Sequence, residues 1–173
     1  MYDLYSCSPD DRSRFILGHS GAKKLLVVGL NPSTATQEKS DTTVAKVQEV
    51  ARLTGFDGFV MLNLYPVRAT DFKTLPLDGD LAAIEQNLAA IEAVVRGEEQ
   101  PVIWAAWGQS ILARGFFISA AKQLAVRLSP YSPMWQHHGP LTKNGHPRHP
   151  SRLNYASKFS PFKINAYVNH PDA

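Results

Sequence analysis

The chain has 173 residues, of which 44% are hydrophobic and 10% aromatic, and it carries a formal net charge of +3 at pH 7. This length and composition predict one folded domain over residues 1–173 and exclude an intrinsically disordered chain. No stretch approaches the roughly 18 consecutive apolar residues of a membrane helix, and the first residues lack a basic segment followed by an apolar one. We therefore expect a cytoplasmic protein with no signal peptide and no membrane partner. The single cysteine, Cys7, excludes an internal disulfide and a metal site made of cysteines alone.

The first half of the chain combines two aromatic-bearing pieces with a strand–helix–strand pattern. Residues 1–19 contain the aromatic pieces around Ser8-Pro-Asp-Asp11, which indicates a hairpin or an edge flap. A buried strand is predicted over 25–30, ending abruptly in Asn31-Pro-Ser-Thr34. A helix over 42–54 follows with Asp41 as N-cap, and a second strand over 58–64 contains Asn63 near its end.

The second half continues the alternation and then becomes irregular. Helices are predicted over 80–96 and from 109 to about 127, on either side of a strand over 102–107. A short fourth strand is expected near 134–137, and a tail helix over 158–168 with Ser160 as N-cap and Pro161 as its first residue. This order predicts an α/β fold, a three-layer α/β/α sandwich with a central, mainly parallel four-stranded sheet.

The charges are unevenly distributed along the chain. Residues 1–99 contain ten Lys/Arg and fourteen Asp/Glu, whereas residues 100–173 contain eight Lys/Arg and one acid, Asp172. A segment this basic favours a phosphate-rich partner, and the alternative is a solvated surface that aids solubility. Lys143, Arg148 and Arg152 lie in its proline-rich loop without any acid, the pattern expected of a loop that meets a phosphate backbone.

Unusual polar residues follow the predicted strands at one edge of the sheet, where open α/β sheets bind ligands. An amide such as Asn31 or Asn63 donates and accepts at once, so it can orient a water or recognise the edge of a nucleobase. The alternative is that each amide only holds its own turn. Two amides at consecutive strand ends, with His149 in a later loop that could stabilise negative charge, favour a site.

The sequence lacks the motifs of common cofactors. There is no Gly-x-Gly-x-x-Gly and no Walker loop, so we expect neither a dinucleotide site nor an NTP-hydrolysing site. There is also no Gly-x-Ser-x-Gly elbow, so we expect no serine hydrolase site. His146 and His149 lie in a proline-stiffened loop rather than on one helix face, which argues against metal binding. His137 and His138 are expected at the surface, and Trp104 and Trp107 in the core.

Four short segments, in a consistent order, resemble the uracil-DNA glycosylase superfamily. They are Gly29-Leu-Asn-Pro32, Phe59-Val-Met-Leu-Asn-Leu-Tyr-Pro66, Trp107-Gly108 and His149-Pro-Ser-Arg-Leu-Asn154. A second combination also resembles a bacterial and phage family known only as a domain of unknown function. It consists of Asn31-Pro-Ser-Thr-Ala35, Asn63-Leu64, Arg68-Ala-Thr70, Trp107-Gly108 and Gly145-His-Pro-Arg-His-Pro150. The first resemblance implies a DNA glycosylase, which flips a base out of the DNA strand and hydrolyses its N-glycosidic bond without a cofactor.

The resemblance also implies roles for individual residues. Asn31 would position the attacking water, and His149 would stabilise the departing base. The base would be bound by Asn63, with Pro32 and Tyr65 beside it. The superfamily has a stacking aromatic residue after the first motif, but residues 35–39 contain none, so Tyr65 would take its place. The DNA contacts would come from Ser151 at a phosphate, from Leu153 or Arg152 as a wedge in the duplex, and from Arg148 and Lys143.

The sequence departs from the superfamily at one important position. The classical first motif has an aspartate that activates water, with a tyrosine close behind it, where this chain has Asn31 and Ser33. Since an amide is no general base, two alternatives stay open beside a monomeric glycosylase. One is a nucleic-acid-binding module on the same fold that does not cut, and the other is a hydrolase of free nucleosides or nucleotides.

Overall fold

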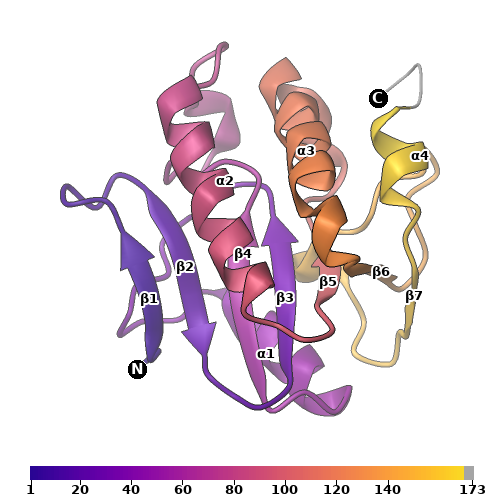
Figure 1. Cartoon of the computed structure of the whole chain (residues 1–173). Helices are drawn as coiled ribbons and strands as arrows, with labels where there is room; N and C mark the ends of the chain where they lie inside the picture. Colours follow the sequence, from indigo (N-terminus) through magenta and orange to yellow (C-terminus); the bar gives the residue numbers. More distant parts are fainter. Residues whose placement is uncertain (170–173) are drawn as a thin grey trace.

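Seven strands form one mixed sheet in the structure, a computed structural model that describes residues 1–169 (Figure 1). The strand order is β1-β2-β4-β3-β5-β6-β7. In chain order the strands are β1 (Leu4–Cys7), β2 (Arg14–His19), β3 (Lys24–Gly29), β4 (Gly58–Asn63), β5 (Val102–Ala105), β6 (Met134–His138) and β7 (Phe159–Pro161). The predicted α/β class is confirmed, but the sheet has seven strands rather than four.

The additional strands lie at the two ends of the sheet. Strands β4, β3, β5 and β6 are parallel neighbours, whereas β1, β2 and β7 are antiparallel to the strands they pair with. The predicted hairpin is therefore present, and it joins the sheet because Leu17 pairs with Met61 of β4. The predicted tail helix is wrong in its first half, because Ser160 and Pro161 pair with β6 and the helix begins only at Ile164.

Four α-helices in the described residues 1–169 cover the sheet. They are α1 (Thr42–Leu53), α2 (Leu81–Arg96), α3 (Gly115–Leu128) and α4 (Ile164–Val168), with short 3-10 helices η1 (Phe72–Thr74), η2 (Gln109–Ala113), η3 (Ser129–Tyr131) and η4 (Pro150–Arg152). Asp41 caps α1 as predicted, since its carboxylate accepts a hydrogen bond from Val44 N at 2.9 Å. The third helix begins later than predicted, because Arg114 is extended (φ −145°) and separates η2 from α3.

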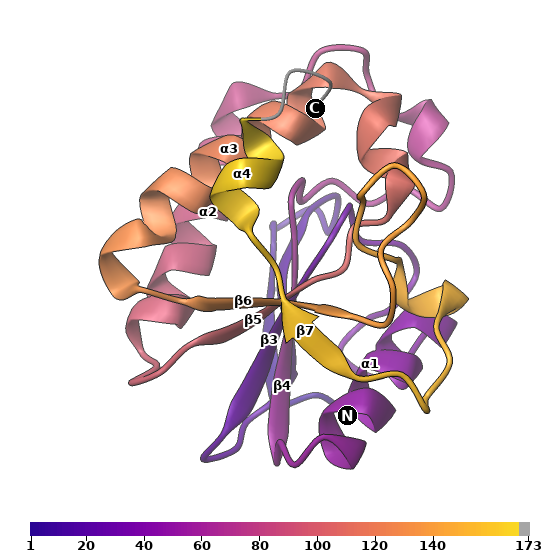
Figure 2. The same ribbon diagram turned by 90° about the vertical axis from the view of Figure 1, so that its right-hand side faces the viewer.

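Helices lie on both faces of the sheet, with α1 on one face and α2, α3 and α4 on the other (Figures 1 and 2). The alternation of side chains along β3 produces two cores. Leu26 and Val28 belong to the larger one, which also contains residues of α2 and α3, whereas Leu25 and Val27 pack with residues of α1. The sheet thus buries both of its faces, as its nearly continuous apolar strands predict.

Strand β6 lies between β5 and β7, and this changes the environment of its last residue. His138 was expected at the surface but is 1% exposed, packed between Trp104 and Phe159 with ring centroids at 5.3 and 4.9 Å. Trp104 and Trp107 are both buried, as predicted. Among residues 1–169, no helix combines the length and apolar character needed to cross a membrane.

Candidate functional site

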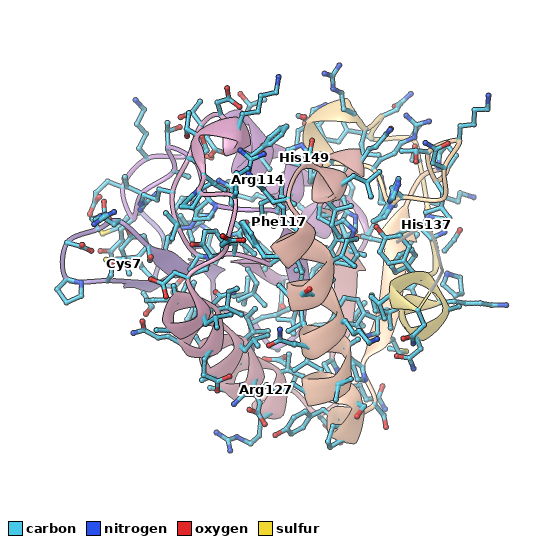
Figure 3. The ribbon with its side chains drawn as sticks, turned by 90° about the horizontal axis from the view of Figure 1, so that it is seen from above. Cys7, Arg114, Phe117, Arg127, His137 and His149 are labelled. Atoms are coloured by element: carbon cyan, nitrogen blue, oxygen red, sulfur yellow. The ribbon has the colours of Figure 1, made fainter. Side chains whose placement is uncertain are left out.

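A cavity of about 840 Å³ lies where β3, β4 and β5 end, next to the N-terminus of α1. Its lining comes from segments far apart in the sequence, and Asn31, Asn63 and His149 all belong to it. Figure 3 shows His149 and Arg127 of α3 on opposite sides of the molecule. Since α1 lies on the face opposite α3 in Figure 2, His149 is on the same side as α1. The cavity therefore occupies the position at which open α/β sheets bind ligands, and it brings together the three residues predicted from sequence.

Asn63 supplies a buried amide to this cavity. Its side chain is 1% exposed, and within residues 1–169 neither Nδ2 nor Oδ1 has a hydrogen-bond partner. Asn87 Nδ2 donates to the Asn63 carbonyl at 2.8 Å and fixes the backbone. A Cβ atom at Gly29 would lie 2.9 Å from Asn63 Oδ1, so glycine leaves the space that the amide needs. Asn63 is thus a fixed donor and acceptor available to a ligand.

Asn31 is held by its own loop and by the loop that follows β4. Its Nδ2 donates to the carbonyls of Pro32 and Ala69, at 3.0 and 2.9 Å. The bond to Pro32 is the turn-holding role of the alternative interpretation, whereas the bond to Ala69 joins the loops that follow β3 and β4. Together they engage both protons of the amide nitrogen. The arrangement fixes the amide plane and leaves Oδ1 as the atom that can accept a hydrogen bond in the cavity.

His149 is held in one tautomer by Ser151. The backbone N–H of Ser151 donates to His149 Nδ1 at 3.3 Å, and the Ser151 hydroxyl lies 2.8 Å from the same nitrogen. A neutral imidazole that accepts at Nδ1 carries its proton on Nε2. Burial lowers the pKa of His149, an effect that Asp41 opposes and Arg152 reinforces. The ring is therefore a neutral hydrogen-bond donor at neutral pH.

The Trp-Gly pair after β5 makes room for this histidine. Gly108 has φ +74°, in the left-handed region that glycine tolerates, and a Cβ atom there would lie 3.1 Å from the His149 Cβ. Trp107 Nε1 donates to the Tyr167 hydroxyl at 3.3 Å, and that hydroxyl lies 2.8 Å from His146 Nδ1. This chain of contacts connects the end of β5 to α4 and to the loop before His149.

The predicted DNA contacts divide into two groups. Ser151, Arg148 and Arg152 line the cavity, although the Ser151 hydroxyl is engaged with His149 and Arg148 Nε donates to the Pro140 carbonyl at 2.9 Å. Lys143 is exposed but lies outside the lining. Leu153 also lies outside and is buried in the core beside α1, with its carbonyl held by Lys46 Nζ at 3.0 Å.

Pro32 lines the cavity, but Tyr65 does not. Tyr65 is 1% exposed, packs against Phe116 and Phe117 of α3, and accepts a hydrogen bond from Asp80 N at 3.2 Å. Its ring therefore cannot stack on a ligand in the cavity. The expectation that Tyr65 takes the place of the missing stacking aromatic is wrong. Phe72 of η1 is the aromatic side chain that follows the β4 exit and does line the cavity.

Two charged groups in the lining were not predicted from the sequence as site residues. Asp41, predicted only as a helix cap, is the one carboxylate among the described residues that line the cavity. Arg14 lies on β2 and is 2% exposed. The only sequence signal for Arg14 was a cation at the start of the apolar segment Arg14–Leu17. Within residues 1–169, no group of three or more His, Cys, Asp or Glu side chains is placed to hold a metal ion.

Arg68 fixes the loop that follows β3. Its Nη1 donates to the carbonyls of Ser33 and Ala35, at 3.1 and 2.8 Å. Its Nη2 donates to the Tyr5 hydroxyl at 2.8 Å and forms an ion pair with Asp11 at 3.0 Å. The loop that carries Asn31 is thereby fastened to the β1–β2 hairpin.

The fold and the cavity define a class of protein: an open α/β sheet with a polar cavity at the carboxyl ends of its parallel strands. The chain belongs to a family of proteins of unknown function (DUF1643), whose family model matches residues 14–151. The prediction of a family known only as a domain of unknown function is thus confirmed. Every cavity-lining residue except Arg152 falls within the matched segment. None of the curated proteins and none of the solved structures compared with this chain matches it.

Proposed function

We propose that this protein binds a nucleobase flipped out of a DNA strand and hydrolyses its N-glycosidic bond. One observation carries the proposal: Asn31, Asn63 and His149 come from three distant segments and line the same cavity. Its volume of about 840 Å³ falls in the range of roughly 300–1,000 Å³ that is usual for small-molecule sites. The resemblance to the uracil-DNA glycosylase superfamily supports the assignment through the same three residues.

The chemistry of the lining suits this reaction. When the glycosidic bond breaks, the base leaves with the bonding electrons and the sugar becomes cation-like. The neutral His149, with its proton on Nε2, donates to the departing base, and the amide of Asn63 binds the base edge. Such preorganised donors stabilise the charge that develops in the transition state. Phe72 offers a ring on which the base can stack.

The attacking water needs an acceptor for its proton, which an amide cannot provide. We assign this role to Asp41, the carboxylate in the described part of the lining. Its Oδ1 accepts from Val44 N, so Oδ2 is the oxygen that can accept a proton. Asn31 Oδ1 accepts a hydrogen bond from the same water and orients it. The water oxygen then bonds to the sugar carbon as the base departs, and the proton passes through Asp41 to solvent.

The test is a panel of single- and double-stranded oligonucleotides that carry uracil, hypoxanthine, xanthine or a modified pyrimidine. Base release is followed by alkaline cleavage of the abasic site. Wild type is expected to release at least one of these bases, and Asn31→Ala and His149→Ala to lose that activity. Tyr65→Phe is the matched control, because Tyr65 is buried outside the cavity and should keep full activity. No release by wild type, or equal rates in the cavity variants, would overturn the proposal.

One observation favours a non-catalytic nucleic-acid-binding module instead. The first motif has the amide Asn31 in place of an acid. Both protons of its amide nitrogen are engaged by backbone carbonyls, so only Oδ1 is free to contact a ligand. Such a module would bind oligonucleotides with an affinity that falls as salt rises, because cationic side chains release counterions from the phosphates. It would release no base from any member of the panel.

A further inference from the structure

Arg14 places a buried cation in the cavity. Strand β2 is antiparallel to β4, so its first residue lies at the end of the sheet where β4 exits, and Arg14 N donates to the Pro66 carbonyl at 3.0 Å. Arg14 is 2% exposed and Asn63 1%, whereas Arg152 and Ser151 are exposed. Arg14 and Asn63 therefore form the floor of the cavity, and the segment 151–152 lies at its mouth.

Among residues 1–169, the positive charge of Arg14 has no acidic partner in direct contact. Its Nη1 donates to the Ala35 carbonyl at 3.2 Å, its Nε has no hydrogen-bond partner, and no Asp or Glu of residues 1–169 forms an ion pair with it. Burial, followed by the nearby Arg68, lowers the pKa of Arg14 to about 10, so the guanidinium stays charged at neutral pH. A buried charge without a partner is unfavourable, and a ligand of opposite charge would relieve that cost.

We propose that Arg14 forms a subsite for a negatively charged or oxygen-rich group at the inner end of the ligand. A guanidinium only donates hydrogen bonds, and its planar fork matches paired acceptors. An amino group at this position would face donors alone. The inference rests on the proposed function for the identity of the ligand as part of a nucleotide. The acceptor is then either the oxo edge of a base or a phosphate group.

The two sources predict different consequences. If the oxo edge lies on Arg14, the guanidinium stabilises the charge that grows on the base as it departs, and it contributes more in the transition state than in the bound substrate. If a phosphate lies there, the ligand is a free nucleotide that enters phosphate first. The chemistry that Arg14 recognises is the same in both cases.

The experiment measures thermal stabilisation and calorimetric binding with the full chain. The probes are uracil, xanthine, adenine, deoxyuridine, deoxyuridine monophosphate and inorganic phosphate. Arg14→Met removes the charge while filling a similar volume, and Arg14→Lys keeps the charge but loses the fork. Arg114→Met is the matched control, since Arg114 also donates only to backbone carbonyls but lies outside the lining.

We expect wild type to bind an oxo base or a phosphate probe more tightly than adenine, and Arg14→Met to lose that affinity by about tenfold to a hundredfold. Arg14→Lys should keep part of it. Preference for xanthine and uracil identifies the base edge, and preference for the monophosphate and phosphate identifies the phosphate. Apo Arg14→Met should be as stable as wild type or more so, because it lacks an unpaired buried charge.

Two results would overturn the subsite. One is equal affinities in wild type and Arg14→Met, and the other is an apo Arg14→Met less stable than wild type with no probe bound by wild type. This failure is distinct from that of the proposed function. Wild type that binds through Arg14 but releases no base overturns only the glycosylase activity. Base release that Arg14→Met leaves unchanged overturns only the subsite.

Discussion

Replacing Asp41 with asparagine should separate its catalytic role from its structural one. Asp41 and Asp80 both cap helices: Asp41 accepts from Val44 N at 2.9 Å, and Asp80 accepts from the backbone N–H groups of Ala82 and Ala83 at 2.9 and 3.1 Å. Only Asp41 lines the cavity. Asparagine caps helices about as well as aspartate, so the substitution removes the charge and keeps the cap.

The magnitudes follow from these two roles. Asp41→Asn should change the free energy of unfolding by less than about 0.5 kcal/mol. A positioned general base typically contributes about 10²- to 10⁴-fold, so base release should slow by that factor. Asp80→Ala should show the reverse pattern, losing about 1 kcal/mol from the lost cap. That loss corresponds to a drop in Tm of about 2–4 °C for a chain of this size. Its base-release rate below Tm should be unchanged.

The assay pairs single-turnover base release with thermal unfolding of the same preparations. Asp80→Asn provides the control for the substitution itself, and it should match wild type in both measurements. An Asp41→Asn protein that releases base at the wild-type rate would refute the assignment of Asp41 as the proton acceptor. A large loss of stability in Asp41→Asn would refute the claim that its amide preserves the cap.

Other substitutions test the packing around the cavity. Gly29→Ala should slow base release about tenfold to a hundredfold, because its Cβ would lie 2.9 Å from Asn63 Oδ1. Circular dichroism should show that the fold is retained, and an unchanged rate would show that the amide can move aside. Leu153→Ala should cost about 2–3 kcal/mol in urea unfolding, since the side chain is buried in the core; unchanged stability with lost DNA affinity would instead support the wedge role. Burial lowers the pKa of His138 below its ordinary value of 6.5, so the unfolded chain binds its proton first and the free energy of unfolding falls as pH drops below about 6.5. His138→Gln should lose less stability than wild type between about pH 7.5 and 5.5 in urea titrations, and parallel losses would contradict this assignment. Arg152→Ala should reduce the slope of log affinity for DNA against log salt by about 0.9, and an unchanged slope would remove Arg152 from the phosphate contacts.

The sequence predicted the centre of the fold well because the signals there are local. Strands β3, β4 and β5 are short apolar runs, polar turns follow β3 and β4, and α1 and α2 have an aspartate cap and an apolar stripe. Parallel strands share one exit edge, so Asn31 and Asn63 could be placed together from topology alone. His149 joined them because its loop follows the last parallel strand of the sheet.

The edges of the sheet and the charged part of the site depend on long-range pairing instead. Nothing near Arg14 in sequence shows that β2 will lie against β4, so an arginine that becomes buried in the cavity could not be distinguished from one at the surface. Residues 159–161 pair with β6, which overrides the local helix signal of Ser160 and Pro161. Tyr65 was misplaced because β4 ends at Asn63, and the regular alternation of faces does not continue beyond that residue.

The antiparallel outer strands have a consequence for aggregation. The family model matches residues 14–151, so β1 precedes the matched segment and β7 follows it, and these two strands form the outer edges of the sheet. A chain trimmed to the match would keep nearly the whole cavity but expose the backbone N–H and C=O groups of β2 and β6. Such unpaired edges are templates for strand pairing between copies. Strand β7 has three residues and ends in Pro161, which has no N–H to donate, so the intact chain presents a much poorer template on that side.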